Sequence, residues 1–283
     1  MEGHRGWVGL LLLLALAAGT AGAAELDPED GKITAGTYRN PYFGLIYPLA
    51  PGWAEGPEPA PPSSDGYYVL NTPVRRDGRG PTMVIAAQDM FFSPEPIANA
   101  MQMAADLRRK ASAEPRAETR LTQVTIAGRS FARLAIDGEA SSRLVLATTI
   151  RCHVVSISLA APDSASLDTL VPSFNALSLA AASATSAGRT EAGTNLPICI
   201  KNYATDHTIT HRVEPVLQGP KAMKVPVRII IAKNGTVKHI HVIAGDPEQR
   251  KTIETALGQW RFKPLRVSDK PVEVETGLVF ETE

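Results

Sequence analysis

The chain has 283 residues, 44% of them hydrophobic, and its 29 lysines and arginines balance its 29 aspartates and glutamates. The length exceeds that of the usual single domain, and the hydrophobic content suffices for ordinary cores. A neutral chain has no electrostatic basis for binding nucleic acid, so we expect no nucleic-acid partner.

The first residues resemble a secretory signal peptide. Arg5 supplies a basic start, residues 8–18 are an apolar run, and Ala21-Gly22-Ala23 offers small residues for cleavage. We therefore expect residues 1–23 to be a signal peptide cleaved near Ala23. The mature protein would be periplasmic or secreted from a bacterial cell, with no stable membrane span. The alternative is an uncleaved anchor, although residues 8–24 are barely long enough, since a spanning helix takes about 20 apolar residues.

The first predicted domain, residues 36–179, begins with strands. Aromatic and β-branched residues favour strands at 38–48, 67–74 and 82–92, with a Pro-rich loop at 51–62. Ser93 then predicts a helix N-cap, with Pro94 at the first helical position. The helix is supported by an apolar stripe at helical spacing, formed by Ile97, Ala100, Met101, Ala104 and Leu107.

Three more strands and a second helix complete this domain. The strands are expected at 120–126, 130–137 and 143–159, with Ala127-Gly128-Arg129 as a hairpin connection. Asp163 is the expected cap of the last helix, which Pro172 should break or kink. Two rounds of strands followed by a helix predict an α+β fold in which an antiparallel sheet carries two helices. This order is similar to that of PsbP-like domains, as is the segment at 40–53, Asn-Pro-Tyr-Phe-Gly-Leu-Ile-Tyr-Pro-Leu-Ala-Pro-Gly-Trp.

Residues 180–195 separate two globular stretches of the chain. They are small and polar and lack hydrophobic periodicity, which predicts a flexible linker. The second predicted domain therefore covers residues 196–283.

The second predicted domain contains a hairpin, a helix and a final strand. Alternation over residues 225–232 predicts a strand, Asn234-Gly235 a tight turn, and residues 236–243 the returning strand. Asp246 and Gln249 form a capping-box pattern, Pro247 opens the helix, and residues 260–264 end it. Residues 271–280 predict the last strand. These elements would form a small antiparallel sheet with one helix on its apolar side.

This second domain resembles the C-terminal domain of TonB. The resemblance covers about residues 210–283 and rests on the order of the Asn234-Gly235 turn, Trp-Arg-Phe-Lys-Pro at 260–264 and a Val-rich final strand. In that family the domain binds a short extended segment of an outer-membrane receptor by adding it to the exposed last strand. The resemblance therefore implies a partner-binding edge strand here, formed by Val272, Val274, Thr276, Leu278 and Phe280.

Several features depart from the TonB pattern. A folded domain and a short linker replace the long Pro-rich spacer, and the N-terminal segment looks cleavable. Met223 stands where the family usually has Gly, and Glu214-Pro215 stands where it often has Tyr-Pro. Pro226 inside the first strand implies a sheet edge or a bulge at that point. The fold therefore carries over better than energy transduction does.

The two cysteines, Cys152 and Cys199, fall in different predicted domains. In an oxidising compartment they could pair, closing a loop of about 48 residues worth roughly 4 kcal/mol on the chain-entropy model. The alternative, which the domain division favours, is two buried thiols with no bond between them. Their spacing fits no metal or redox motif.

Candidate chemical sites are few in this sequence. A surface metal site could be formed by His207, His211, His239 and His241. Strand alternation, however, predicts His239 and His241 on the uncovered, solvent-facing side of the sheet, and we expect no metal site. The chain has no nucleophile elbow, phosphate loop or dinucleotide fingerprint, so we expect no enzyme activity, no catalytic residue and no cofactor.

These observations favour a non-enzymatic periplasmic or secreted protein that binds a protein partner of the envelope or outer membrane by β-strand addition. The exposed edge could also pair with a second copy, giving a homodimer. One alternative is a TonB-type energy transducer for outer-membrane transport, if residues 1–24 stay attached. Another is a small-ligand carrier or an unrecognised enzyme on the first domain, which a pocket lined by Trp53, Tyr67 and Phe91 would support.

Overall fold

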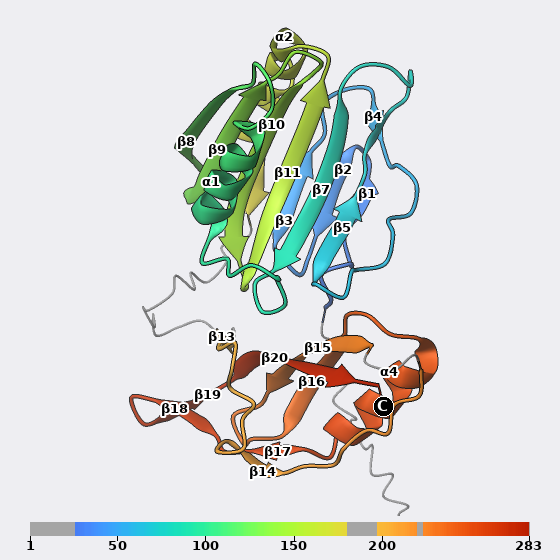
Figure 1. The fold of residues 1–283 in the computed structure, drawn as a ribbon, viewed down its shortest axis with the longest axis vertical. Coiled ribbons are helices and arrows are strands. Elements are labelled where there is room, and N and C mark those ends of the chain that lie inside the picture. The colour runs from blue at the N-terminus through green and yellow to red at the C-terminus, as the bar shows by residue number, and fades with distance from the viewer. Residues whose placement is uncertain (1–25, 180–196, 220–222, 283) are drawn as a thin grey trace, which may run out of the picture.

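The computed structural model describes residues 26–179, 197–219 and 223–282. The expected signal peptide, residues 1–23, and the expected linker, residues 180–195, lie outside the described residues. The fold is α+β and dominated by antiparallel sheets, and it contains two large hydrophobic cores. We call residues 26–179 the first unit and residues 197–282 the second unit (Figure 1). No helix of the described residues is long and apolar enough to cross a membrane.

The first unit is built on two facing sheets. The larger has six strands in the order β5-β7-β11-β10-β9-β8. These strands are β5 (Tyr67–Asn71), β7 (Thr82–Asp89), β8 (Glu118–Ile126), β9 (Arg129–Asp137), β10 (Ser142–Ile150) and β11 (His153–Ala161). The smaller sheet consists of β1 (Lys32–Thr34), β2 (Thr37–Asn40), β3 (Leu45–Pro48) and β12 (Ser178–Leu179). A separate short pair is formed by β4 (Trp53–Ala54) and β6 (Val74–Arg75).

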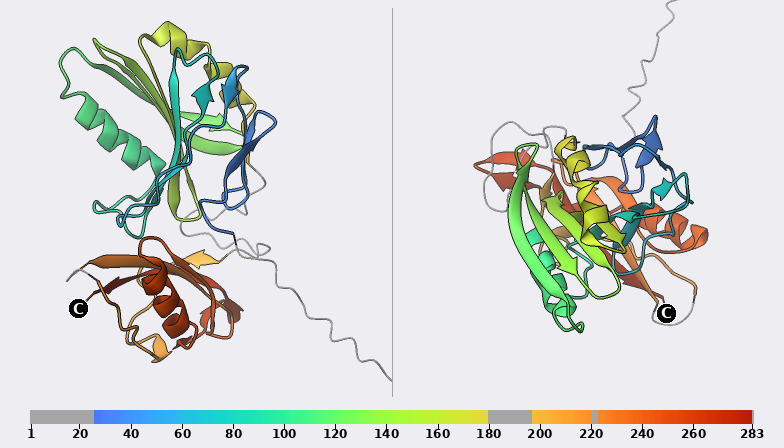
Figure 2. Two further views of the ribbon diagram at one scale, coloured as in Figure 1. Left: turned by 90° about the vertical axis from the view of Figure 1, so that its right-hand side faces the viewer. Right: turned by 90° about the horizontal axis from the view of Figure 1, so that it is seen from above.

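The core of the first unit lies between these two sheets. Tyr38 and Tyr47 from the small sheet pack with Ile85 and Ile157 from the large one, and all four are almost fully buried. Helix α1 (Ala100–Ala111) covers the opposite face of the large sheet. There Ala104 packs in a separate, smaller hydrophobic cluster with Leu134 and Ile136 of β9. Figure 2 shows α1 and the small sheet on opposite sides of the large sheet.

The first helix begins later than the sequence expectation, and the last helix ends earlier, at Leu257 rather than at residues 260–264. Helix α1 is capped by Asn99, whose Oδ1 accepts from the Gln102 N–H, rather than by Ser93. The physical reason is Pro96, because a residue that precedes proline is disfavoured in the helical region. The expected break at Pro172 is confirmed: α2 (Ser164–Asp168), capped by Asp163, ends before α3 (Val171–Asn175) begins.

Two long predicted strands of the first unit are hairpins. Residues 38–48 divide into β2 and β3, and residues 143–159 divide into β10 and β11. The second division occurs at Arg151 and Cys152, whose φ angles are 48° and 55°. A two-residue hairpin turn of type I′ needs positive φ at both central positions, a conformation normally marked by Gly or Asn. The sequence carries neither residue there, so the turn was missed. The Ala127-Gly128 hairpin between β8 and β9 is confirmed.

The second unit has a four-stranded sheet in the order β13-β20-β15-β16. Its strands are β13 (Ile198–Cys199), β15 (Lys224–Ile231), β16 (Val237–Val242) and β20 (Val274–Glu281). Two short pairs flank it, β14 (Ile209–His211) with β17 (Arg261–Phe262), and β18 (Leu265–Val267) with β19 (Lys270–Val272). The Asn234-Gly235 turn and the Asp246–Gln249 capping box of α4 (Pro247–Leu257) are confirmed.

One face of this sheet packs on α4. Val227, Ile229 and Ile231 point to that side and form a core with Ile253 and Trp260, all buried. Pro226, expected at an edge or bulge, lies instead in the central strand β15. Proline is tolerated there because Pro226 lies opposite Ile243, just past the end of β16, where the sheet ladder stops. The Pro226 carbonyl still accepts a hydrogen bond from the Ile243 N–H at 3.0 Å.

The other face of this sheet lies against the first unit. Because directly paired residues share a face, Arg228, Ile230, His239, His241 and Glu275 all point away from α4. The left view in Figure 2 shows the sheet between α4 and the first unit. His239 and His241 were expected to face solvent; that expectation is wrong, since His241 is only 5% exposed. Sequence alternation identified the face correctly but could not show what covers it.

Candidate functional site

The outer edge of β20 is the candidate partner-binding site, and hydrogen-bond directions show which residues form it. The Thr282 N–H donates to the Met223 carbonyl on the β15 side, at 3.1 Å. The Glu273 and Glu275 carbonyls accept from Ile198 and Ile200 on the opposite side, at 2.8 and 2.9 Å. Backbone groups of successive strand residues point to opposite sides, so those of Gly277 and Val279 point outward, away from β15.

The first part of this edge is occupied by the chain itself. Strand β13 pairs in parallel with Val274 and Glu275. Cys199, within β13, is joined by a disulfide to Cys152 in the turn between β10 and β11, with 6.3 Å between the two Cα atoms. The favoured expectation of two unbonded thiols is therefore wrong, because the packing of the two units brings the cysteines together. Strand β13 is therefore attached to the first unit by the disulfide and to the second unit by its pairing with β20.

Four of the five residues expected to form the partner-binding edge lie in the last strand, β20, and one does not. Val272 lies in β19, which pairs with β18 and is separate from β20. The other four, Val274, Thr276, Leu278 and Phe280, lie in β20 and pair with β15. Val274 and Thr276 are fully buried on the α4 side. The outward backbone groups belong to the intervening residues, of which Val279 is 51% exposed.

A buried group of charges joins the two units beneath this strand. The Arg228 guanidinium donates to Asp89 Oδ2 from Nε at 3.0 Å and from Nη2 at 2.6 Å. Arg228 Nη1 also lies 2.9 Å from Glu275 Oε1, and all three side chains are at most 2% exposed. Asp89 ends β7 of the first unit, so this contact crosses between the units. Two carboxylates around one guanidinium hold the pKa of Arg228 well above its ordinary value despite burial.

Further groups extend this buried cluster. The Tyr42 hydroxyl donates to Glu275 Oε1 at 3.0 Å, and Arg151 lies over the Tyr42 ring, 3.8 Å from its centre. Burial raises the pKa of Asp89, outweighing the effect of Arg228, and burial together with Arg228 lowers the pKa of His153 well below its usual value. Because its hydrogen bonds and ion pairs join residues of both units, we interpret the cluster as a clamp between the units.

Gly277 is required where β20 passes the first unit. A Cβ at this position would lie 2.8 Å from Phe92 Cζ and 3.1 Å from Phe91 Cβ. The Phe91 ring is itself covered by Arg228, 4.4 Å from its centre. The glycine lets the loop after β7 approach the strand, so the outward edge begins beside the first unit and extends towards Val279.

The two histidines of β16 contact the start of the first unit. His239 Nε2 lies 3.0 Å from Asp27 Oδ1, and His241 Nε2 lies 3.2 Å from Glu29 Oε1. Burial raises the pKa of Asp27, but the hydrogen bond with His239 and the charges of both histidines leave it below its ordinary value. Among the described residues, no group of three or more His, Cys, Asp and Glu side chains could hold a metal ion. His207 and His211 lie elsewhere, near and on β14.

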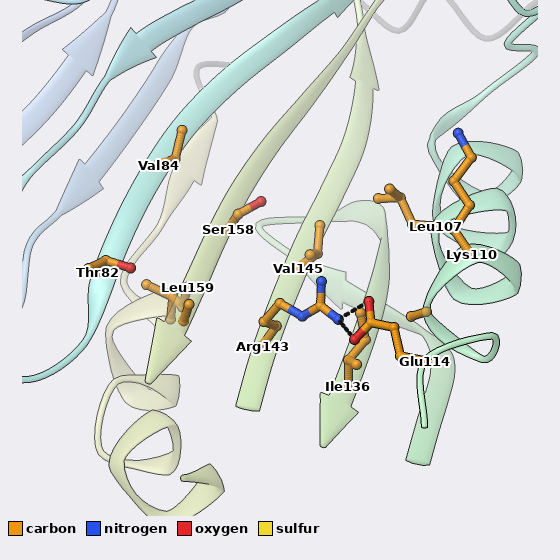
Figure 3. Close-up of a pocket in the computed structure, with 12 residues that line it drawn as sticks. Thr82, Val84, Leu107, Lys110, Glu114, Ile136, Arg143, Val145, Ser158 and Leu159 are labelled. Atoms are coloured by element: carbon orange, nitrogen blue, oxygen red, sulfur yellow. Dashed lines mark hydrogen bonds and ion pairs between the residues drawn. The ribbon is translucent and has the colours of Figure 1, made fainter. Parts of the chain in front are cut away.

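The aromatic residues proposed for a ligand pocket do not meet. Trp53 is buried in the first core, Phe91 packs under Arg228, and Tyr67 is 43% exposed on β5. A different groove of about 310 Å³ lies between α1 and the large sheet (Figure 3). Arg143 at its wall is paired with Glu114 at 2.6 Å. Its polar lining comes mainly from such surface side chains, and we assign it no role.

Comparison with known proteins gives a limited result. No protein-family model matches the chain, and no curated protein is similar to it. Among solved structures it is similar to the solution structure of cyanobacterial PsbP (CyanoP) from Synechocystis sp. PCC 6803, with 13% identity and a TM-score of 0.34. The match covers 58% of this chain and 98% of that one. The neighbour is PsbP-like, as the sequence suggested, but a likeness this weak carries no argument about function. The resemblance to TonB stays a prediction.

Proposed function

We propose that this chain is a non-enzymatic binding protein of the bacterial envelope, in which a TonB-like second unit binds a protein partner by β-strand addition. The observation that carries the proposal is the outer edge of β20. Among the described residues, no strand pairs with this edge beyond Glu275. The Gly277 and Val279 backbone groups there point outward, next to the half-exposed Val279 side chain.

The chain itself provides an example of the proposed interaction. Strand β13 arrives from a distant part of the sequence and adds to β20 through backbone hydrogen bonds at Glu273 and Glu275. A partner segment placed beyond β13 would continue the same line along Gly277 and Val279. Each backbone hydrogen bond contributes about 0.5–1.5 kcal/mol net. Because the free edge is short and offers few such bonds, it supports a weak, exchangeable complex.

The proposal restricts where a partner can bind. One face of the sheet is covered by α4, and the other lies against the first unit, where Arg228 pairs with Asp89 and Glu275 accepts a hydrogen bond from Tyr42. A partner is therefore limited to the edge, and the first unit would help to select it because Phe92 lies beside Gly277.

Val279→Pro tests this proposal. The Val279 N–H points outward, so proline removes one donor from the partner edge and leaves every bond to β15 in place. We expect capture of partner proteins from envelope extract by the immobilised mature chain to fall by about tenfold or more. Val279→Thr, which keeps the N–H and the branched side chain, is the matched control. Equal capture by both variants, with unchanged thermal unfolding, would refute the proposal.

A further inference from the structure

Strand β8 is the outermost strand of the six-stranded sheet, and its outer edge is open (Figure 1). Within the described residues, β9 is the strand that pairs with β8, and no other does. The nine residues of β8 pair with β9 without a bulge, and they include neither proline nor glycine. Natural proteins usually blunt such edges with short strands, bulges or proline, because an open edge pairs with another strand. A long, regular edge therefore indicates an interaction surface.

The turn after β8 shows which backbone groups face outward. Ala127 and Gly128 form a two-residue turn with φ angles of 49° and 74°, and Ile126 pairs with Arg129 across it. The two residues that flank such a turn bond to each other, and every second residue before them also bonds to the neighbouring strand. The intervening residues of β8 direct their N–H and carbonyl groups outward; these are Thr119, Leu121, Gln123 and Thr125.

The sequence of β8 is complementary to itself in the antiparallel direction. Two copies can pair about Thr122, which then lies opposite Thr122 of the second copy. In this register Thr119 lies opposite Thr125. Leu121 likewise lies opposite Gln123, so each residue with outward backbone groups meets another such residue, as in an antiparallel hydrogen-bonded pair. The register uses the whole strand and yields about eight backbone hydrogen bonds between the copies.

The charges of β8 agree with this register. Glu118 and Arg120 are the charged residues of the strand, and both are exposed. In the two-fold pairing Glu118 lies opposite Ile126, and Arg120 lies opposite Val124, so no like charges meet. Ile126 and Val124 are only partly buried against the first core, and the methylene groups of the opposite charged side chains would cover them. Like charges placed directly opposite would instead destabilise the pair of strands.

The other edge of the same sheet, at β5, is irregular and engaged by its own chain. The Ser63 N–H donates to the Tyr67 carbonyl at 2.9 Å, and the Tyr67 N–H donates to Ser63 Oγ at 3.1 Å. A bulge between Val69 and Asn71 also interrupts the pairing of β5 with β7. Pairing through β8 therefore gives a closed dimer and no fibre, because a two-fold contact uses the same surface on both copies.

We propose that β8 binds a second copy of this chain, so that two six-stranded sheets join across a two-fold axis at Thr122. This interface is separate from the outer edge of β20, which stays free in the dimer. The dimer carries two such β20 edges, and a partner with two segments would be held more tightly than by either edge alone. This last consequence rests on the proposed function, whereas the dimer itself does not.

Sedimentation velocity of the full mature chain, from about 1 to about 300 µM, tests the proposal, and we expect a concentration-dependent dimer. Thr122→Lys and Thr122→Glu each place like charges opposite on the axis, so each should raise the dissociation constant about fivefold or more. An equimolar mixture of the two variants should dimerise within about twofold of the natural chain, because opposite charges then meet. Thr125→Lys, at an exposed position that lies opposite the neutral Thr119, is the matched control and should dimerise like the natural chain.

Two further measurements locate the interface. The outward amides of β8 should show slower hydrogen exchange as the protein concentration rises. Val279→Pro, which changes the β20 edge, should leave the dimer unchanged even if it removes partner binding. The proposal is overturned if the natural chain stays monomeric over the whole range, if the mixture of Thr122 variants stays dissociated, if Thr122→Lys and Thr125→Lys behave alike, or if Val279→Pro removes the dimer.

Discussion

Arg228→Met is expected to destabilise the protein far more than the loss of any surface ion pair. The guanidinium lies within 3.0 Å of oxygens from both Asp89 and Glu275, and all three side chains are at most 2% exposed. Methionine fills much of the volume but leaves two carboxylates buried without a cation. Removing one partner of a buried pair typically costs about 3–5 kcal/mol, which is a large part of a usual free energy of unfolding.

The assay is urea unfolding followed by tryptophan fluorescence, since Trp53 lies in the core of the first unit and Trp260 in that of the second. Arg143→Met is the matched control, because Arg143 pairs with Glu114 on the surface, where both side chains are more than a third exposed. Its expected cost is below about 1 kcal/mol. The triple variant Arg228→Met, Asp89→Asn, Glu275→Gln should recover most of the loss, because no charge then remains buried.

The pH dependence of the same variant gives a second check. The pKa of Asp89 is already raised by burial, and removal of Arg228 takes away its main opposing influence. A carboxyl whose pKa in the folded protein lies above that in the unfolded chain favours folding at low pH and loses that contribution as pH rises. The deficit of Arg228→Met should therefore be largest near pH 7 and shrink as the pH is lowered towards 4. A deficit equal to that of Arg143→Met, with no change across this range, would refute the clamp.

Three further predictions concern the disulfide, the histidine contacts and the N-terminus. The double variant Cys152→Ser, Cys199→Ser should lose roughly 4 kcal/mol or less of its free energy of unfolding. Because β13 is then released from the first unit, the backbone amide of Glu275 should show faster hydrogen exchange. Unchanged exchange at Glu275 would contradict the proposal that the disulfide holds β13 in place. Asp27→Asn should be less stable than the natural protein at pH 7 by under about 1 kcal/mol in thermal unfolding. Because the folded pKa of Asp27 is lowered, this difference should vanish as the pH falls below that value, and a difference that persists there would exclude the histidine pairing. Intact mass of the protein from cells should show a start near Ala24; a start at Met1 would instead support an anchored energy transducer.

Local patterns were sufficient for much of the fold. The Asn234-Gly235 turn, the Asp246 capping box and the helix break at Pro172 were predicted because each depends on the conformation of a few neighbouring residues. The turn at Arg151-Cys152 was missed because its positive φ angles are held by the surrounding hairpin rather than by glycine or asparagine. The shift of the α1 cap to Asn99 follows from a proline rule that the sequence already contained.

The sequence predicted only the approximate position of the strand that carries the candidate edge. Alternation placed a final strand near residues 271–280, but it could not show that Val272 belongs to a separate hairpin or that β13 covers Glu275. Strand pairing depends on which segments meet in space, and a two-residue strand such as β13 has no periodicity to detect.

The sequence by itself determined the α+β class, the faces of the long strands of the second unit and most of the local turns and caps, since these depend on neighbours a few residues apart. Only the tertiary structure decided what each face meets: the first unit over His241, Asp89 beside Arg228, and Cys152 bonded to Cys199. The physical reason is that these contacts join residues between 47 and 212 positions apart, and such contacts depend on the packing of whole sheets. No short pattern of polar residues specifies its partner.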